Sequence, residues 1–298
     1  MTKVIVIVGP TGVGKTKLSI ELAKKLDGEI INADSTQVYR GLNIATAKVK
    51  EDEMQGIKHH LLDIRNLDEE YNVFDYQQDA RLVIDQLLAS AKTPILVGGT
   101  GLYIKAALYD YQFSHEDVKD EYLELSDDQV YAELKAVDCN TNIHPNNRKR
   151  VVRSLNYFNS HQVPLSNKMK DERLIYEVLM IGLTTDRDCL YKVINQRVDL
   201  MMESGLLAEA NALYMAKERS RAVLTPIGYK ELFPYFHGDI TLEEALKTIK
   251  QSSRKYAKRQ YTWFNHQLDV TWFKTNYEDF DSTVNEVLEY IKKNRDLK

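Results

Sequence analysis

Short runs of consecutive apolar residues mark the predicted strands of this chain. Residues 4–8 read Val-Ile-Val-Ile-Val, and residues 94–97 read Pro-Ile-Leu-Val. Apolar runs rich in β-branched residues, without alternating polar positions, are typical of strands buried on both faces of a parallel sheet. Residues 29–33 and 176–183 show the same tendency, and residues 59–64 form a weaker candidate. The chain is therefore expected to contain a buried parallel sheet.

Apolar residues at helical spacing lie between these candidate strands. Leucines recur every four residues from Leu18 to Leu26, and residues 75–91 show a similar period. Residues 188–217 carry a longer helical pattern that breaks at Gly205. Strands that alternate with helices predict an α/β fold, with a parallel sheet flanked by helices.

A glycine-rich segment joins the first strand to the first helix. It matches the pattern G-x-x-x-x-G-K-[ST], in the order strand, loop and helix that this motif requires. The predicted phosphate-binding residues are Gly9, Pro10, Thr11, Gly12, Val13, Gly14, Lys15 and Thr16. Backbone N–H groups of such a loop bind phosphate together with the N-terminus of the helix. We expect a P-loop NTPase-like core in which Lys15 neutralises a terminal phosphate and the Thr16 hydroxyl binds Mg²⁺.

Polar and glycine-rich segments follow two other predicted strands. Asp34 and Ser35 come directly after residues 29–33, and a Gly-Gly-Thr-Gly turn that contains Thr100 follows residues 94–97. Ligands of open α/β sheets bind at the carboxyl ends of the strands. We therefore expect Asp34 to lie beside the phosphate loop.

Composition and charge restrict the classes of protein to consider. The chain has 298 residues, of which 43% are hydrophobic and 28% charged, as in an ordinary soluble globular protein. Its two cysteines, Cys139 and Cys189, are far apart, which argues against a disulfide framework or a zinc site and favours a cytoplasmic location. Because His59 and His60 would point to opposite faces of a strand, a structural role is favoured over shared metal ligation. We expect no signal peptide and no membrane contact.

The balance of charge changes in the middle of the chain. Residues 115–138 contain nine acidic residues and two lysines, whereas residues 144–173 are mainly basic. Both stretches have a polar, helical pattern. We predict a core of residues 1–112 and 173–298, with an inserted, mainly α-helical subdomain of residues 113–172. Because the net charge is −4, nucleic acid would bind only through local patches, and the basic half of the insertion is one candidate.

A second basic segment lies nearer the C-terminal end. Residues 247–264 contain six lysines and arginines, no acidic residue, and four aromatic residues between them. A helix with a basic face and aromatic neighbours suits a polynucleotide backbone. A surface helix that its aromatic side chains anchor to the core explains the same pattern equally well.

Several segments together resemble the tRNA dimethylallyltransferases. They are residues 9–16, 34–41, 46–48, 59–63, 98–103, 150–155, 227–231 and 256–264. Many families share the phosphate loop. The Asp-Ser-Thr-Gln-Val-Tyr sequence after the second strand and the Ala-Lys-Arg-Gln sequence of the second basic segment are much more specific. The resemblance covers nearly the whole chain in order.

This resemblance implies prenyl transfer to tRNA, at the anticodon stem-loop. A dimethylallyl group would move from dimethylallyl diphosphate to N6 of the adenosine on the 3′ side of the anticodon, and pyrophosphate would leave. Asp34 is then the expected general base, with Lys15 on the leaving diphosphate and Thr100 near the reacting centre. Mg²⁺ is the expected cofactor, on Thr16. The residues expected to contact tRNA, the first four of them around the base, are Asp34, Ser35, Thr36, Gln37, Arg150, Arg153, Arg254, Lys258, Arg259 and Gln260.

One position departs from the family pattern. Many relatives have an arginine three residues before the Ile-Gly-Tyr turn, whereas residues 223–226 of this chain read Val-Leu-Thr-Pro. Either another cation such as Arg219 or Arg221 substitutes for it, or Mg²⁺ and Lys15 suffice.

Three other functions agree with parts of the sequence. An adenine-nucleotide isopentenyltransferase and a P-loop small-molecule kinase would share the core, but the two basic segments favour tRNA. A non-catalytic RNA-binding protein does not account for Asp34 beside an intact Gly-Lys-Thr sequence. The sequence indicates no obligate protein partner, and it leaves the oligomeric state and the choice of tRNA open.

Overall fold

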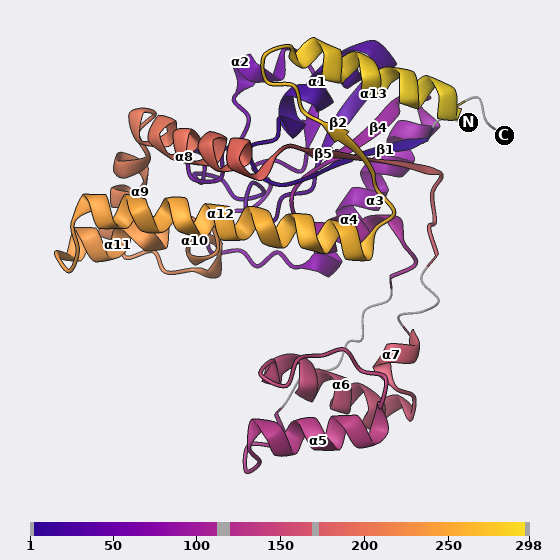
Figure 1. The fold of residues 1–298 in the computed structure, drawn as a ribbon, viewed down its shortest axis with the longest axis vertical. Coiled ribbons are helices and arrows are strands. Elements are labelled where there is room, and N and C mark those ends of the chain that lie inside the picture. Colours follow the sequence, from indigo (N-terminus) through magenta and orange to yellow (C-terminus); the bar gives the residue numbers. More distant parts are fainter. Residues whose placement is uncertain (1–2, 112–119, 169–172, 296–298) are drawn as a thin grey trace. The chain divides into compact units, whose positions relative to one another are not determined.

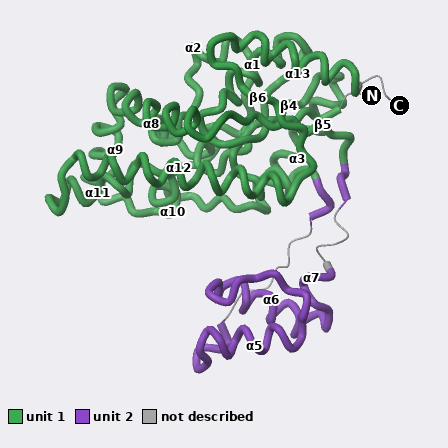
Figure 2. Tube along the Cα trace, viewed as in Figure 1, with its two compact units in different colours: residues 1–108, 176–298 green, residues 109–175 purple. Residues whose placement is uncertain are grey.

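The computed structural model describes residues 3–111, 120–168 and 173–295. The chain divides into a larger compact unit, residues 1–108 and 176–298, and a smaller one, residues 109–175 (Figure 2). The insertion predicted for residues 113–172 falls within the smaller unit, and both of its predicted boundaries lie outside the described residues. The larger unit is therefore built from two segments that are far apart in the sequence.

One parallel sheet forms the centre of the larger unit. Among the described residues its strand order is β3-β2-β4-β1-β5-β6, and all neighbouring strands are parallel (Figure 1). The strands are β1 Val4–Val8, β2 Gly28–Asn32, β3 His59–His60, β4 Thr93–Val97, β5 Val178–Thr184 and β6 Thr271–Lys274. The predicted α/β fold is confirmed, and β1, which leads into the phosphate loop, lies in the interior of the sheet.

Two strands differ from the prediction. The candidate over residues 59–64 contains only the short β3, because Leu61 and Asp63 adopt φ values of 61° and 52° that end the extended backbone. The edge strand β6 was not predicted. Only Phe273 of its four residues is buried, so β6 has no apolar run by which it could be found.

Helices cover both faces of the sheet. Figure 1 shows α1 and α13 over one face and α3 and α4 over the other. The helices of the larger unit are α1 Lys15–Leu26, α2 Glu51–Met54, α3 Val73–Ala89, α4 Gly101–Leu108, α8 Arg187–Glu203, α9 Leu206–Met215, α10 Arg221–Leu224, α11 Tyr229–His237, α12 Leu242–Gln267 and α13 Phe280–Arg295. Within the described ranges, no helix has the length and apolar character needed to cross a membrane.

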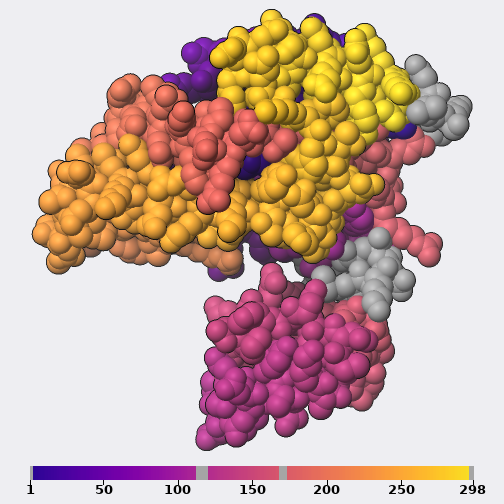
Figure 3. Space-filling model, in the orientation of Figure 1, coloured from indigo at the N-terminus to yellow at the C-terminus, as the bar shows by residue number. Residues whose placement is uncertain are grey.

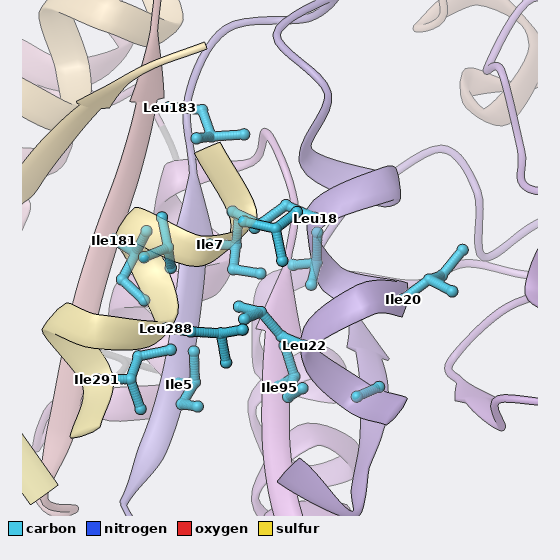
Figure 4. Close-up of a cluster of buried hydrophobic side chains, with 14 of the residues drawn as sticks. Ile5, Ile7, Leu18, Ile20, Leu22, Ile95, Ile181, Leu183, Leu288 and Ile291 are labelled. Atoms are coloured by element: carbon cyan, nitrogen blue, oxygen red, sulfur yellow. The ribbon is translucent and has the colours of Figure 1, made fainter. Parts of the chain in front are cut away.

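Apolar side chains from the sheet and two helices form the main core. Ile5 and Ile7 of β1, Ile181 of β5, Leu18 of α1 and Leu288 of α13 gather between the sheet and these helices (Figure 4). Full burial of one such side chain stabilises the fold by about 1.5–3 kcal/mol. This core holds β1 and α1, the two elements that flank the phosphate loop.

The long helical patterns of the C-terminal half are confirmed. Gly205, with φ 100°, separates α8 from α9 where the pattern breaks. The second basic segment is part of α12, which begins earlier than predicted because the Thr241 side chain accepts a hydrogen bond from the N–H of Glu244 and caps the helix. Ala257 and Phe264 of α12 are fully buried, so one stripe of this helix belongs to the core.

The smaller unit has a core of its own. Its helices are α5 Asp127–Val137, α6 Arg148–His161 and α7 Leu165–Lys168. The buried residues between α5 and α6 are Val130, Leu134, Val151, Val152 and Leu155. Arg148 pairs with Asp120 at 2.8 Å and with Asp127 at 2.9 Å, and also donates to the carbonyl oxygens of Tyr122 and Leu125. These bonds fasten the segment before α5 to the start of α6.

Candidate active site

The carboxyl ends of three strands meet around one cavity. The phosphate loop follows β1, Asp34 follows β2, and the Gly98-Gly99-Thr100 turn follows β4. A cavity of about 780 Å³ is lined by the loop, by residues 34–37, by Gly98 and Gly99, and by parts of α8 and α12. In Figure 3, indigo atoms of the N-terminal segment are visible in a hollow between the salmon atoms of α8 and the orange atoms of α12. The fold thus brings most of the phosphate loop, residues 34–37, Arg259 and Gln260 to one cavity, whereas Thr100, Arg254 and Lys258 are not among its lining residues.

The backbone of the phosphate loop depends on its glycines. Gly9 and Gly14 have φ values of 140° and 91°, which residues with a Cβ rarely adopt. A Cβ at Gly14 would lie 2.6 Å from the ring of Phe280, and one at Gly9 would lie 2.4 Å from the carbonyl oxygen of Leu183. Gly14 also provides no side-chain cap for α1. The first N–H groups of α1 can therefore bind an anion.

Lys15 lies in the wall of the cavity. Its Nζ donates to the carbonyl oxygen of Pro10 at 2.8 Å. Burial, followed by the positive charge of Arg197, lowers the pKa of Lys15 to about 7, against the opposing effect of Asp34. A diphosphate in the cavity would favour the charged form of this lysine.

Arg197 of α8 supplies a second cation, which the sequence analysis missed. Its Nη1 donates to Oγ1 of Thr11 at 3.1 Å. Burial lowers the pKa of its guanidinium, and Asp34 opposes this shift. No motif marks this residue. The available signal was helical spacing, since Arg197 lies three residues after Ile194 and next to Val198, the buried positions of α8.

The two arginines considered as substitutes for the missing family cation lie elsewhere. Arg219 stacks on Phe233, with its guanidinium carbon 4.2 Å from the ring centroid, and donates to the carbonyl oxygen of Glu218. Neither Arg219 nor Arg221 is among the described residues that line the cavity. It is Arg197 that contacts the phosphate loop.

The Asp34 carboxylate is held in one orientation. Its Oδ1 accepts hydrogen bonds from the backbone N–H of Thr36 at 2.9 Å and from the Thr36 hydroxyl at 2.6 Å. Oδ1 of Asn32 accepts the backbone N–H of Asp34 at 3.1 Å. Oδ2 of Asp34 has no hydrogen-bond partner in the part of the chain that the structure describes. This oxygen can accept a proton from a bound molecule.

The turn after β4 is joined to the turn after β2. Oγ1 of Thr100 accepts the backbone N–H of Ser35 at 3.1 Å and lies 3.4 Å from Oγ of Ser35. Gln37 donates through Nε2 to the carbonyl oxygen of Thr46 at 2.9 Å. Ser35, Thr36 and Gln37 all line the cavity. The residues predicted to surround the base therefore share a wall with Asp34.

Comparison with known proteins identifies the family. A family model described as IPP transferase matches residues 37–267, most of the chain. The chain belongs to the IPP transferase family. The resemblance seen in the sequence is thereby confirmed.

Relatives of this IPP transferase match it along nearly its whole length. A tRNA dimethylallyltransferase of Anoxybacillus flavithermus is 48% identical over 97% of this chain and 96% of its own. One of Bacillus subtilis is 46% identical over 91% of this chain and 90% of its own. A solved tRNA isopentenylpyrophosphate transferase of Bacillus halodurans has 42% identity and a TM-score of 0.76, covering 98% of this chain and 96% of that one. A eukaryotic dimethylallyltransferase acting on tRNA has 29% identity and a TM-score of 0.84, covering 97% and 78%.

The exposed basic residues of this IPP transferase lie in both units. Lys258 and Arg259 of α12 are exposed, and Arg259 also lines the cavity. Arg150 and Arg153 of α6 are exposed on the smaller unit. All four stay predicted RNA contacts, and only Arg259 is at the cavity.

Two other predicted RNA contacts have protein partners. Gln260 is only 6% exposed, and its amide is bonded to the N–H of Thr11 and the carbonyl oxygen of Gly99. Arg254 is partly buried and donates to Oδ1 of Asn195 of α8 at 2.6 Å. Gln260 lines the cavity and stays a predicted RNA contact, although its amide is already bonded to the protein backbone.

Asp34 is the one carboxylate among the described residues that line the IPP transferase cavity. Thr16 and Asp34 line it, and the described residues include no group of three or more His, Cys, Asp or Glu side chains that could hold a metal. Mg²⁺ usually keeps several waters and shares substrate phosphates, so this small donor set fits the ion.

His60 pairs with Glu29 at 2.6 Å, which supports the structural interpretation of that histidine.

Proposed function

We propose that this protein transfers a dimethylallyl group from dimethylallyl diphosphate to the N6 amine of an adenosine in tRNA and releases pyrophosphate. The observation that carries the proposal is that a phosphate loop and Asp34 line one cavity. Relatives at 46–48% identity are named tRNA dimethylallyltransferases, and one structural relative is a dimethylallyltransferase acting on tRNA. Phosphate-binding and proton-accepting groups in one cavity match the two ends of this reaction.

The phosphate loop would hold the diphosphate end of the donor. Lys15 and Arg197 face this end with positive charge, together with the first N–H groups of α1. As the C1–O bond of the donor breaks, the electron pair leaves with the diphosphate. Prearranged positive groups at this place stabilise the developing charge. The Thr16 hydroxyl would hold Mg²⁺, which would supply further positive charge toward the diphosphate.

Asp34 would act on the acceptor. The lone pair of adenine N6 is delocalised into the ring, which makes this amine a poor nucleophile. As the new N6–C1 bond forms, N6 gains positive charge and one of its protons passes to Oδ2 of Asp34. General-base catalysis of this kind is typically worth about 10²–10⁴-fold. Thr36 holds Oδ1 and so keeps Oδ2 available.

The RNA must present its base to this cavity. Chemistry on a base requires that the base leave its stack, and Ser35, Thr36 and Gln37 line a wall where it would fit. The protein has a net charge of −4, so local groups must bind the phosphates. Those groups would be the exposed arginine and lysine residues of α6 and α12. Cys139 and Cys189 are both free thiols, in agreement with a cytoplasmic site of action.

The test is incubation of the purified protein with dimethylallyl diphosphate, Mg²⁺ and unmodified tRNA, followed by mass analysis of the nucleosides. We expect N6-isopentenyladenosine and one pyrophosphate for each group transferred. Omission of donor, omission of tRNA and addition of EDTA are the controls, and each should suppress the product. AMP in place of tRNA tests a nucleotide acceptor, and labelled ATP tests phosphoryl transfer. Prenylated AMP beside unmodified tRNA, or a phosphorylated product, would contradict the proposal.

A further inference from the structure

One buried amide of α12 connects two loops of the cavity. Oε1 of Gln260 accepts the backbone N–H of Thr11 at 2.9 Å, and Nε2 of Gln260 donates to the carbonyl oxygen of Gly99 at 3.0 Å. Thr11 belongs to the phosphate loop after β1, and Gly99 to the turn after β4. A single side chain therefore bridges these two segments beyond the carboxyl ends of the paired strands β1 and β4.

The turn after β4 lies directly against α12. A Cβ added at Gly99 would lie 2.1 Å from Nε2 of Gln260, and one at Gly101 would lie 2.1 Å from the ring of Trp263. Real Cβ atoms do not approach other atoms so closely, so a side chain at Gly99 would displace the Gln260 amide and one at Gly101 would displace the Trp263 ring. The turn therefore packs closely against the side chains of α12.

The turn held by Gln260 continues the connection toward Asp34. Thr100, the neighbour of Gly99, donates its backbone N–H to the carbonyl oxygen of Ala33 at 3.2 Å. Oγ1 of Thr100 accepts the backbone N–H of Ser35 at 3.1 Å. Asp34 lies between Ala33 and Ser35, so the turn after β4 links the Gln260 amide to both neighbours of the proposed base.

We propose, on the basis of the function proposed above, that Gln260 is a positioning residue that sets the distance between the leaving diphosphate and the acceptor adenine. Gln260 is only 6% exposed, and both polar atoms of its amide are bonded to the backbone of the two loops. It holds the phosphate loop through Thr11 and, through Gly99, the turn that contains Thr100. Reacting atoms must be held about 3–3.5 Å apart, and a misplacement of roughly 1 Å can cost 10²-fold in rate. Loss of the Gln260 amide should therefore reduce the rate of transfer more than the binding of either substrate.

The test compares Gln260→Met with Gln251→Met. Methionine has nearly the length of glutamine but makes neither hydrogen bond, and Gln251 is exposed on the same helix. We expect Gln260→Met to lower kcat by a factor on the order of 10², with the Kd for tRNA and the KM for dimethylallyl diphosphate within about threefold of the wild type. Gln251→Met should behave as the wild type. A wild-type kcat in Gln260→Met, or a loss of tRNA affinity that accounts for its loss of activity, would overturn the assignment.

A second variant keeps the test decisive if Gln260→Met does not fold. Gln260→Glu retains an oxygen for the N–H of Thr11, but when ionised it cannot donate to Gly99. A protonated glutamic acid can donate again. The activity of Gln260→Glu relative to the wild type should therefore rise as the pH is lowered, whereas a constant ratio would overturn the proposal. Wild-type transfer to tRNA is measured first, because its absence would refute the proposed function itself, and a fully active variant would refute only the role of Gln260.

Discussion

The two basic helices, α6 and α12, resemble each other in sequence and differ in what they hold together. In α6, Arg148 is tied to Asp120 and Asp127, and the helix completes the small core of its own unit. In α12, Arg254 is tied to Asn195 of α8, and Gln260 is tied to two loops of the cavity. In each helix, therefore, some residues stabilise the fold of their unit, and others expose positive charge to solvent.

The two helices differ in the unit to which they belong. Changes on α6 should alter how strongly RNA is held, because α6 belongs to the smaller unit, whereas the phosphate loop and Asp34 belong to the larger one. Changes on α12 should also alter the rate of transfer, since Tyr256, Arg259 and Gln260 line the cavity. A run of positive charge in a sequence therefore does not say whether its residues bind a polyanion or position an active site.

The largest effect on transfer is expected from Asp34→Asn, because Asp34 lies in the cavity and is the proposed general base. Asparagine keeps the shape and can still accept from Thr36, but it cannot take the N6 proton. We expect transfer to fall by a factor on the order of 10² or more, with unchanged tRNA affinity. Single-turnover rates and filter-binding titrations measure the two quantities. Near-normal transfer would remove Asp34 from the role of base.

The pH dependence should separate donor binding from RNA binding. The pKa of Lys15 in the free protein is lowered to about 7, and a bound diphosphate would raise it. Above pH 7, donor binding must therefore take up a proton, so donor affinity should fall as the pH rises, by at most about tenfold per pH unit. Below pH 7 the lysine is already charged and contributes no further change. The affinity of the protein for tRNA, to which α6 contributes, should not show this pH dependence.

The matched control for this pH effect is Lys15→Arg, which stays charged throughout the range. Calorimetric titration with pyrophosphate from pH 6 to 9 compares the two proteins, over the range set by the pKa of about 7. Equal slopes would show that another group titrates.

A smaller effect is expected from the exposed basic pairs. Each phosphate contact adds about 0.9 to the salt slope on a duplex and about 0.7 on a single strand. Arg150→Ala with Arg153→Ala should therefore flatten the plot of log K against log salt by roughly one to two units and leave kcat at saturating tRNA unchanged. Lys258→Ala with Arg259→Ala should flatten the slope similarly and also lower kcat.

The control pair for the salt experiment is Lys292→Ala with Lys293→Ala, exposed on α13. This pair should change neither the salt slope of tRNA binding nor kcat at saturating tRNA. If the α6 pair lowered kcat at saturation, or the α12 pair did not, the contrast between the two helices would be lost.

The smallest effect on transfer is expected from Arg148→Ala. Removal of this guanidinium leaves Asp120 and Asp127 without their partner and should destabilise the smaller unit alone. Limited proteolysis should cleave that unit faster, by roughly several-fold, while pyrophosphate binding to the larger unit stays the same. Lys149→Ala, one residue further on and exposed, serves as the control. Equal cleavage of the two variants would show that Arg148 is dispensable for this fold.

Local sequence patterns predicted most of the fold. The interior strands β1 and β4 are short apolar runs because both of their faces are buried, and the phosphate loop has a motif because its backbone tolerates only certain residues. The edge strand β6 is buried at one position only, so it lacks that pattern. Its place depends on tertiary packing against β5, which single-sequence patterns do not show.

Site residues that belong to a local sequence pattern could be predicted. Residues that reach the site only through tertiary packing could not. Asp34 was found because it follows a strand, whereas Arg197 reaches the loop only through the packing of α8. Gln260 was predicted as an RNA contact from the family resemblance, and that prediction did not include its bonds to the two loops. Helical spacing indicates its burial, since it lies three residues after Ala257 and four before Phe264, on the buried stripe of α12.

The division of the larger unit into two chain segments also has a consequence during synthesis. β1 pairs with β4 on one side and with β5 on the other, and β4 ends at Val97 while β5 begins at Val178. A ribosome that adds about 5–20 residues per second needs roughly 4–16 s to make the residues between them. Throughout that interval the nascent chain carries an apolar strand with one open edge, a template for association with other chains. The smaller unit, which has its own core, can fold during this wait, and β5 must then find the edge before another chain does.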